Sequence, residues 1–357
     1  MTINLKEYGL SERFTQEAAM YDGLFLARVS EQHRDLYRVI GEGGGFEARL
    51  AGKLVHQADS QLSFPAVGDW VMVDRCNDRT GSAIIHHILR RKSALVRKAA
   101  GTKYSEQVIA ANIDTIFICM ALNEDFNVRR LERYLTIAWD SMAAPIIVLT
   151  KSDLCSDLPH KLREISAVSV GVDVITCSAE NGQGFEEINS YVEAGRTIAF
   201  VGSSGVGKST IINRLMGQEV LATGAIREDD GRGRHTTTYR QLLKLPSGGI
   251  VIDTPGMREL QIYTANLSRA FEDIEEIAGS CRFSDCSHGS EPGCAVREAI
   301  HSGTLSAERL QSYLKLQREA AYAELNSRQR EQEKLNRMFG GKNEMKQHRK
   351  QFKGKKN

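Results

Sequence analysis

A glycine-rich segment of nine residues constrains the fold of this chain more than any other feature of its sequence. It follows an apolar stretch at 197–201 and matches the pattern GxxxxGK[ST]: Gly202, Ser203, Ser204, Gly205, Val206, Gly207, Lys208, Ser209 and Thr210. In that pattern the glycines let successive backbone amides point at phosphate oxygens, and the start of the next helix adds its dipole. The segment therefore predicts a phosphate-binding loop between a strand and a helix.

Apolar segments alternate with amphipathic segments around this loop, which indicates an α/β domain. We expect helices near 128–141, 158–169 and 185–194, and strands at 113–122, 145–149, 173–177, 197–201 and 249–252. Near-continuous apolar strands joined by helices predict a parallel sheet that is covered on both faces. Because ligands of such sheets bind at the carboxyl ends of the strands, the loops there are the candidate site.

Two of these loops carry residues suited to a guanine base. The loop after 145–149 is close to the pattern Asn-Lys-x-Asp and consists of Thr150, Lys151, Ser152 and Asp153. The Asp153 carboxylate can accept hydrogen bonds from the ring and exocyclic NH groups of guanine, and Lys151 can cover the base plane. Thr150 supplies a hydroxyl where the pattern has a carboxamide, so we expect softer selectivity for guanine. After the next strand, Ser178 is followed by Ala179, whose amide can reach the guanine oxygen.

Magnesium ligands are expected beside the phosphate loop. Asp253 ends an apolar strand and begins the segment Asp-Thr-Pro-Gly, so it can hold magnesium through water. The Gly256 amide can sense the terminal phosphate. Ser209 would ligate the same ion, and Lys208 would neutralise the outer phosphates.

The polar segment 231–238 lies between the phosphate loop and Asp253. We favour Thr237 as the residue that completes magnesium coordination when the third phosphate is present, which would order this segment. His235 can orient water or RNA, and a plain surface histidine is the alternative. Met257 stands where many GTPases place a water-orienting glutamine, and methionine cannot polarise water. We therefore expect weak hydrolysis by the isolated protein.

The order of these motifs along the chain is unusual. The base-binding loops at 150 and 178 precede the phosphate loop at 202 and the segments at 235 and 253, whereas common GTPases have the reverse order. All of these loops still lie at one edge of one sheet. The order therefore predicts a circularly permuted nucleotide-binding domain.

Three cysteines and a histidine lie close together after this domain: Cys281, Cys286, His288 and Cys294. Three thiolates and one imidazole match a tetrahedral structural zinc site, and the complete set of four leaves no open position for catalysis. Reduced thiols without a metal are the alternative.

The N-terminal part alternates short strands with turns. Strands are expected at 24–29, 35–40, 47–54, 69–74 and 81–88, which predicts a small barrel of the OB type, with an SH3-like barrel as the alternative. The net charge of the whole chain is only +2. Two segments are nonetheless strongly basic, 90–103 and 341–357, and either can contact a polyanion or simply be solvated.

The motifs together resemble the small ribosomal subunit biogenesis GTPase family RsgA, of the YjeQ type. The resemblance covers almost the whole chain, including the barrel segment Phe-Pro-Ala-Val-Gly-Asp-Trp-Val at 64–71, the permuted loops and the Cys/Cys/His/Cys site. It implies a GTP-hydrolysing factor that binds the small (30S) subunit and its rRNA late in maturation, with ribosome-stimulated activity. An RNA-binding factor that uses nucleotide only structurally, or a P-loop ATPase, are the alternatives.

The expected fold class is therefore α/β, a circularly permuted P-loop GTPase domain between an OB-type barrel and a zinc-binding helical domain. The expected boundaries are 1–21 for an N-terminal arm, 22–103 for the barrel and a basic linker, 104–265 for the GTPase domain, 266–340 for the zinc-binding domain and its helix, and 341–357 for a basic tail. The expected cofactors are GTP or GDP, Mg²⁺ and one Zn²⁺. We expect a cytoplasmic protein, because no segment resembles a signal peptide or a membrane span. We also expect a monomer.

Overall fold

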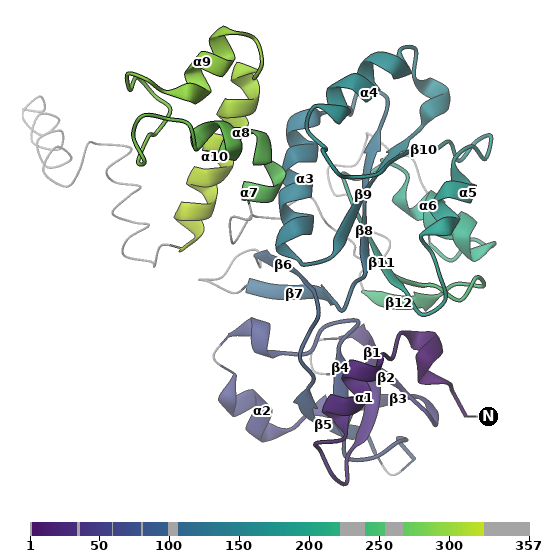
Figure 1. Ribbon diagram of the computed structural model, residues 1–357. Coiled ribbons are helices and arrows are strands. Elements are labelled where there is room, and N and C mark those ends of the chain that lie inside the picture. Colours follow the sequence, from purple (N-terminus) through teal and green to yellow (C-terminus); the bar gives the residue numbers. More distant parts are fainter. Residues whose placement is uncertain are drawn as a thin grey trace, which may run out of the picture. The chain divides into compact units, whose positions relative to one another are not determined.

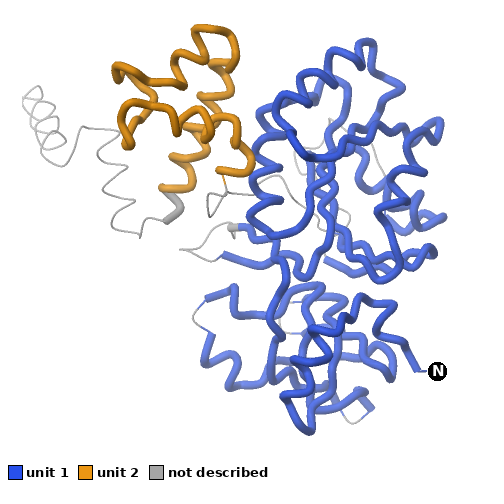
Figure 2. The backbone as a smooth tube through the Cα atoms, viewed as in Figure 1, with its two compact units in different colours: residues 1–261 blue, residues 262–357 orange. Residues whose placement is uncertain are grey.

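The computed structural model describes residues 2–33, 36–58, 60–79, 81–98, 106–221, 240–253 and 267–324. The chain forms two compact units, residues 1–261 and 262–357 (Figure 2). Four residues singled out above lie outside the described residues: His235, Thr237, Gly256 and Met257. The basic tail at 341–357 also lies outside them.

The first unit begins with a five-stranded barrel. Its strands are β1 (Phe25–Gln32), β2 (Tyr37–Gly41), β3 (Gly44–Leu50), β4 (Trp70–Val73) and β5 (Ala83–Ile88). They pair in the order β1-β2-β3-β5-β4, and β4 also pairs with β1, so the barrel is closed. The helix α2 (Gly52–Gln57) and the short η2 (Gln61–Ser63) connect β3 to β4. This closed barrel confirms the predicted OB type.

The residues that precede the barrel belong to its core. The short helices η1 (Leu5–Tyr8) and α1 (Glu12–Ala18) bring Leu5 and Phe14 against Trp70, and all three side chains are buried. The segment 1–21, expected to be an N-terminal arm, therefore packs against the barrel. Burial of its apolar side chains against Trp70 stabilises this arrangement.

A parallel sheet forms the centre of the remaining part of the first unit (Figure 1). Five parallel strands are ordered β10-β9-β8-β11-β13 and have the following bounds: β8 (Thr115–Ala121), β9 (Ala144–Thr150), β10 (Val174–Thr176), β11 (Thr197–Val201) and β13 (Ile250–Asp253). The strand β12 (Gln241–Lys244) pairs antiparallel with β13. The near-continuous burial of β8, β9 and β11 explains why their sequences are almost uninterruptedly apolar.

Helices cover both faces of this sheet. Figure 1 shows α3 on one side and α5 and α6 on the other. The bounds are α3 (Val128–Asp140), η3 (Ser152–Leu154), α4 (Leu158–Ser166), α5 (Phe185–Ser190) and α6 (Lys208–Met216). The three helices predicted from periodicity all form.

The basic run after the barrel is largely structured. Residues 94–98 form β6 (Ala94–Lys98), which pairs antiparallel with β7 (Glu106–Ala111). Arg91 forms an ion pair with the buried Asp69 at 2.7 Å, and Lys92 forms one with Asp114 at 2.6 Å. Arg91 and Lys92 are therefore held by internal carboxylates, and the expectation of a solvated linker holds for neither of them.

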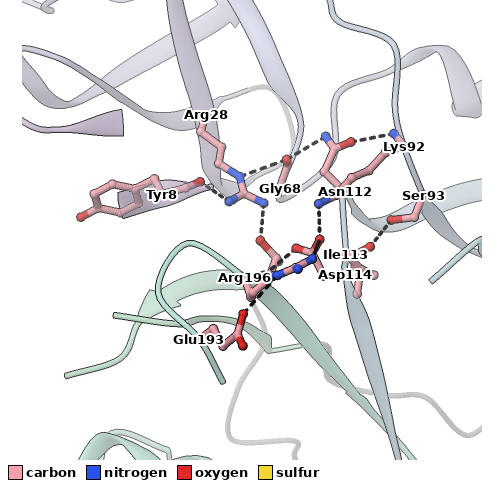
Figure 3. Close-up of polar contacts among 11 residues, drawn as sticks. Tyr8, Arg28, Gly68, Lys92, Ser93, Asn112, Ile113, Asp114, Glu193 and Arg196 are labelled. Atoms are coloured by element: carbon pink, nitrogen blue, oxygen red, sulfur yellow. Dashed lines mark hydrogen bonds and ion pairs between the residues drawn. The ribbon is translucent and has the colours of Figure 1, made fainter. Parts of the chain in front are cut away.

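A buried arginine joins the barrel to the parallel sheet (Figure 3). Arg28 of β1 donates to the Gly68 carbonyl at 3.2 Å and to the Thr197 hydroxyl at 2.9 Å, and it also donates to the Tyr8 carbonyl. Burial lowers the pKa of Arg28 to about 10, so it remains charged at neutral pH. The strand β1 also pairs with β12 at Glu31, so one sheet continues from the barrel into the parallel domain.

The second unit consists of helices. They are α7 (Leu267–Ala270), α8 (Glu272–Ala278), α9 (Ala295–His301) and α10 (Ala307–Glu324). Phe271, Ile274 and Val296 are fully buried in its core. Arg309 of α10 binds Asp273 of α8 through two hydrogen bonds of 2.6 Å. None of the helices in the described ranges combines the length and the hydropathy that a membrane span requires.

Candidate nucleotide and metal sites

The phosphate loop begins where the central strand β11 ends. Gly202 has a φ of +146°, and a Cβ atom there would lie 2.3 Å from the Cys119 carbonyl oxygen of β8, so only glycine fits. Gly207, with a φ of +101°, precedes the first residue of α6. The backbone thus turns sharply from the strand into the helix, which leaves the N-terminal amides of α6 to face the loop.

The Lys208 ammonium curls back over the loop. It donates to the carbonyl oxygens of Gly202 at 2.8 Å and Ser203 at 2.6 Å. An outer phosphate would compete with these two carbonyl oxygens for the ammonium, since a phosphate oxygen is a stronger acceptor than a carbonyl. Ser209 and Thr210 follow in the first turn of α6.

The base loop contacts the phosphate loop directly. The buried Thr150 hydroxyl donates to the carbonyl oxygen of Val206 at 2.6 Å, across 56 residues of sequence. A threonine hydroxyl has one proton, so this bond commits its only donor. Lys151 adopts a left-handed conformation with a φ of +57°, which turns the chain into η3, where Ser152 and Asp153 lie. The two loops predicted to bind one nucleotide therefore lie side by side.

A second pair of contacts fixes the base-binding side. The Ser178 hydroxyl donates to a carboxylate oxygen of Asp153, which orients that carboxylate. Arg214 of α6 donates to the Ala179 carbonyl at 2.6 Å, and its guanidinium lies 4.5 Å from the centre of the Phe185 ring. Because α6 also begins with Lys208, one helix connects the phosphate loop to the loop that contains Ala179.

Two residues that support these loops are not marked by any motif in the sequence. Arg214 is one of them, six positions after Lys208. Tyr134 of α3 is the other: it is almost completely buried and hydrogen-bonded to Ser203. Burial raises the pKa of Tyr134, so it stays a neutral hydroxyl at physiological pH. No motif marks either residue, because both are defined by contacts between segments far apart in the sequence.

Asp253 ends β13, beside the phosphate loop. The strand β13 pairs with β11 through Ala199 and Ile252, so Asp253 and the start of the loop lie at the same edge of the sheet. Gln241 of β12 pairs with Asp253 on one side and with Glu31 of the barrel on the other. One residue of β12 therefore connects the barrel to the strand end that carries the expected magnesium aspartate.

The cysteine cluster lies in the second unit, in a loop at 279–294 that contains neither helix nor strand. The ligand atoms of Cys281, Cys286, His288 and Cys294 all lie within 4.8 Å of one another. The Sγ atoms of Cys281 and Cys294 are 3.9 Å apart, and the Nδ1 atom of His288 is 3.5 Å from the second. A tetrahedral zinc with bonds of 2.3 Å to sulfur requires about 3.8 Å between sulfurs, so this set fits zinc.

Backbone amides stabilise the thiolate form of Cys281. Burial disfavours ionisation of Cys281, but the amides of Val296 and Ala295 at the start of α9 hydrogen-bond to it, and its pKa is lowered overall. Since a metal binds the thiolate, these amides favour the form that coordinates.

A parallel sheet with the base loop and the phosphate loop at its carboxyl edge, in the reverse order along the chain, defines a circularly permuted P-loop GTPase. A family model described as RsgA GTPase matches residues 88–263. The curated relative from Lactiplantibacillus plantarum named "Small ribosomal subunit biogenesis GTPase RsgA 2" is 58% identical over 346 residues, 97% of each chain. This chain therefore belongs to the RsgA GTPase family. It is a GTPase, which implies guanine nucleotide and Mg²⁺.

Other comparisons agree with this assignment. The relative "Small ribosomal subunit biogenesis GTPase RsgA 1" of Oceanobacillus iheyensis is 44% identical, over 90% of this chain and 93% of its own. The crystal structure of YjeQ from Thermotoga maritima matches with a TM-score of 0.62 and 28% identity, covering 84% of this chain and 99% of that one. The structure of YloQ, "a circularly permuted GTPase", matches in fold with a TM-score of 0.58 and 24% identity, covering 85% and 98%.

Proposed function

We propose that this GTPase binds the small (30S) ribosomal subunit and its rRNA late in subunit maturation, and that the subunit stimulates GTP hydrolysis. The observation that carries the nucleotide part is the bond from Thr150 to Val206, which joins the base loop and the phosphate loop into one site. The names of the relatives and the OB-type barrel support the ribosomal part. We propose that the chain acts as a cytoplasmic monomer.

In this proposal each loop has one task at the nucleotide. Asp153, oriented by Ser178, accepts hydrogen bonds from the guanine NH groups, and the Ala179 amide donates to the guanine oxygen. Lys151 covers the base, with Ser152 beside it. The backbone of 202–207 binds phosphate oxygens, together with Ser209 and Thr210. The Lys208 ammonium moves from the two loop carbonyls to the outer phosphates.

Magnesium would be held by Ser209, Asp253 and Thr237. When bound, it neutralises charge on the phosphate oxygens during transfer. Gly256 would donate its amide to the terminal phosphate, and His235 would orient water or rRNA. The GTP state would order 231–238 and 253–258 and thereby fix the barrel against RNA, and hydrolysis would release it.

The second unit would contain one structural zinc. Cys281, Cys286, His288 and Cys294 supply the four ligands, and the complete set gives the ion no open position for chemistry. Its role in this proposal is to hold the loop 279–294 in a fixed shape for contact with the subunit.

The test is GTP hydrolysis with and without purified small subunits. We expect slow turnover alone, because Met257 cannot orient water, and a strong increase with subunits. Turnover that is already fast alone, or unchanged by subunits, would contradict the proposal. His235→Ala should reduce the stimulated rate while leaving GDP affinity intact, and an unchanged stimulated rate would remove His235 from the mechanism.

A further inference from the structure

A basic cavity lies on the barrel, away from the nucleotide site. It has a volume of about 560 Å³ and is bounded by α2, by Leu62 and Ser63, and by the segment 86–91 at the end of β5. This volume is within the range of small-ligand sites. OB-type barrels bind oligonucleotides mainly across their second and third strands. The cavity lies between α2 and β5, so it is a different part of the barrel.

Among the described residues, the titratable side chains that line the cavity are all basic. They are Lys53, His86, His87, Arg90 and Arg91. None of the first four forms an ion pair with any residue that the structure describes. Burial lowers the pKa of His87 and so favours its neutral form. Lys53 and Arg90 therefore supply positive charge to the cavity without an ion-pair partner among the described residues.

The fifth basic residue holds one wall in place. Arg91 pairs with the buried Asp69 and donates to the carbonyl oxygens of Leu62 and Phe64, both at 2.8 Å. On the opposite side of the segment, the Arg90 amide donates to Glu17 of α1 at 2.8 Å. These bonds hold the wall formed by 62–64 and 90–91 in place before any ligand arrives.

Apolar and aromatic groups lie between the charges. Leu54, Leu62 and Ile88 contribute to the lining. The His87 ring stacks on Tyr21 with 4.4 Å between ring centres. Flat and apolar surfaces beside cations suit a nucleotide, because a base stacks on the former while its phosphate is attracted to the latter. A free phosphate would use only the charges.

We propose that this cavity binds an unpaired nucleotide of RNA, at a site separate from the outer face of β2 and β3. The inference rests on the proposed rRNA partner and adds a specific place of contact. Lys53 and Arg90 bind the phosphates on either side of the nucleotide, and its base enters between Leu54 and Ile88. The barrel then holds RNA at two of its faces.

The test uses the full chain with GDP and a fluorescein-labelled single-stranded RNA of about twelve nucleotides. Lys53→Gln with Arg90→Gln should weaken RNA binding about tenfold at moderate salt, since two phosphate contacts are lost. Ser63→Leu fills the cavity without changing charge and should weaken binding by a similar factor. The matched control is Lys6→Gln with Arg163→Gln, which removes two exposed charges that lie outside the cavity, the barrel strands and the nucleotide loops.

Diffuse electrostatic attraction makes a different prediction. It requires equal losses in the two double variants and none in Ser63→Leu, and that result would overturn the proposal. Absence of RNA binding by the unchanged chain would overturn it as well. Crosslinks from a 4-thiouridine RNA should map to 53–63 or 86–91, and crosslinks confined to β2 and β3 would contradict the site. The crosslinks decide the matter if Ser63→Leu unfolds.

A separate measurement keeps this inference distinct from the proposed function. The unchanged chain should sediment with purified small subunits. If it does not, the proposed ribosomal role is wrong. If it does, while the cavity variants bind RNA as the unchanged chain does, only the cavity proposal is wrong. GDP affinity should be the same in all variants, since none of the substituted residues contacts the nucleotide loops.

Discussion

The nucleotide loops and the cysteine cluster both bring reactive groups together, but they do so by opposite means. The nucleotide loops are held by buried parallel strands and by direct bonds between loops, such as that from Thr150 to Val206. The cluster lies in a loop at 279–294 without regular structure, and three of its four ligands are only half-buried. The first site is shaped by the fold, whereas the second depends on the ion it would hold.

The two sites therefore differ in whether ligand binding stabilises the fold. A site built on strands keeps its geometry without ligand, so the binding free energy is available for affinity and specificity. A site in an irregular loop gains its geometry on binding, so much of the binding free energy stabilises the fold. Four experiments test this contrast.

Removal of zinc should have the largest effect and should be confined to the second unit. Chelation, or Cys286→Ser, removes binding free energy of about 10 kcal/mol, so the loop 279–294 and the short α9 should unfold. Limited proteolysis should then cut within 267–324. GDP titration should show unchanged affinity in the first unit. Full protease resistance after chelation would show that the two sites do not differ in this way.

Arg28→Met tests whether the first unit is held by its own buried bonds. The change leaves the Tyr8 carbonyl and the Thr197 hydroxyl without this donor and should lower the free energy of unfolding by about 3 kcal/mol. Urea unfolding of the full chain measures it. Arg38→Met, at an exposed position of β2, is the control and should change stability by less than about 0.5 kcal/mol. Equal effects would contradict the structural role of Arg28.

Lys208→Ala should weaken nucleotide binding without altering the fold. Loss of charge-assisted hydrogen bonds to the phosphates is expected to reduce GTP affinity about 100-fold and to abolish hydrolysis. Calorimetric titration with GTP and with GDP measures the change, and Lys6→Ala, at an exposed position, is the control. GTP affinity within threefold of the unchanged chain would mean that Lys208 remains on its carbonyl partners in the bound state.

Thr150→Val should have the smallest effect. It preserves shape but leaves the Val206 carbonyl without its donor, so GDP affinity should fall about tenfold, and Thr150→Ser should restore it. Since the Thr150 proton is already donated, it cannot reach N7 of guanine. The unchanged chain should therefore bind 7-deaza-GDP about as well as GDP. A selective loss with 7-deaza-GDP would show that Thr150 contacts the base instead.

Much of this arrangement is predictable from short-range pattern. The phosphate loop follows from GxxxxGK[ST] after an apolar segment, and the cluster follows from four ligands within fourteen residues. The five barrel strands and three helices of the GTPase domain follow from their periodicity, except that the strand expected at 47–54 ends at Leu50 and its last three residues belong to α2. The packed N-terminal segment and the internal ion pairs of Arg91 and Lys92 do not, because a basic or apolar residue has no partner until the chain is folded.

The class of site can be predicted from sequence, because strand, glycine turn and lysine must be neighbours along the chain to bind phosphate. Which side chains support that site depends on the folded structure. Thr150, Tyr134 and Arg214 act through partners on other elements, and the distances between those elements are set by the packing of the sheet. Hydrogen bonds depend on separation in space, which no pattern of residues along a chain specifies.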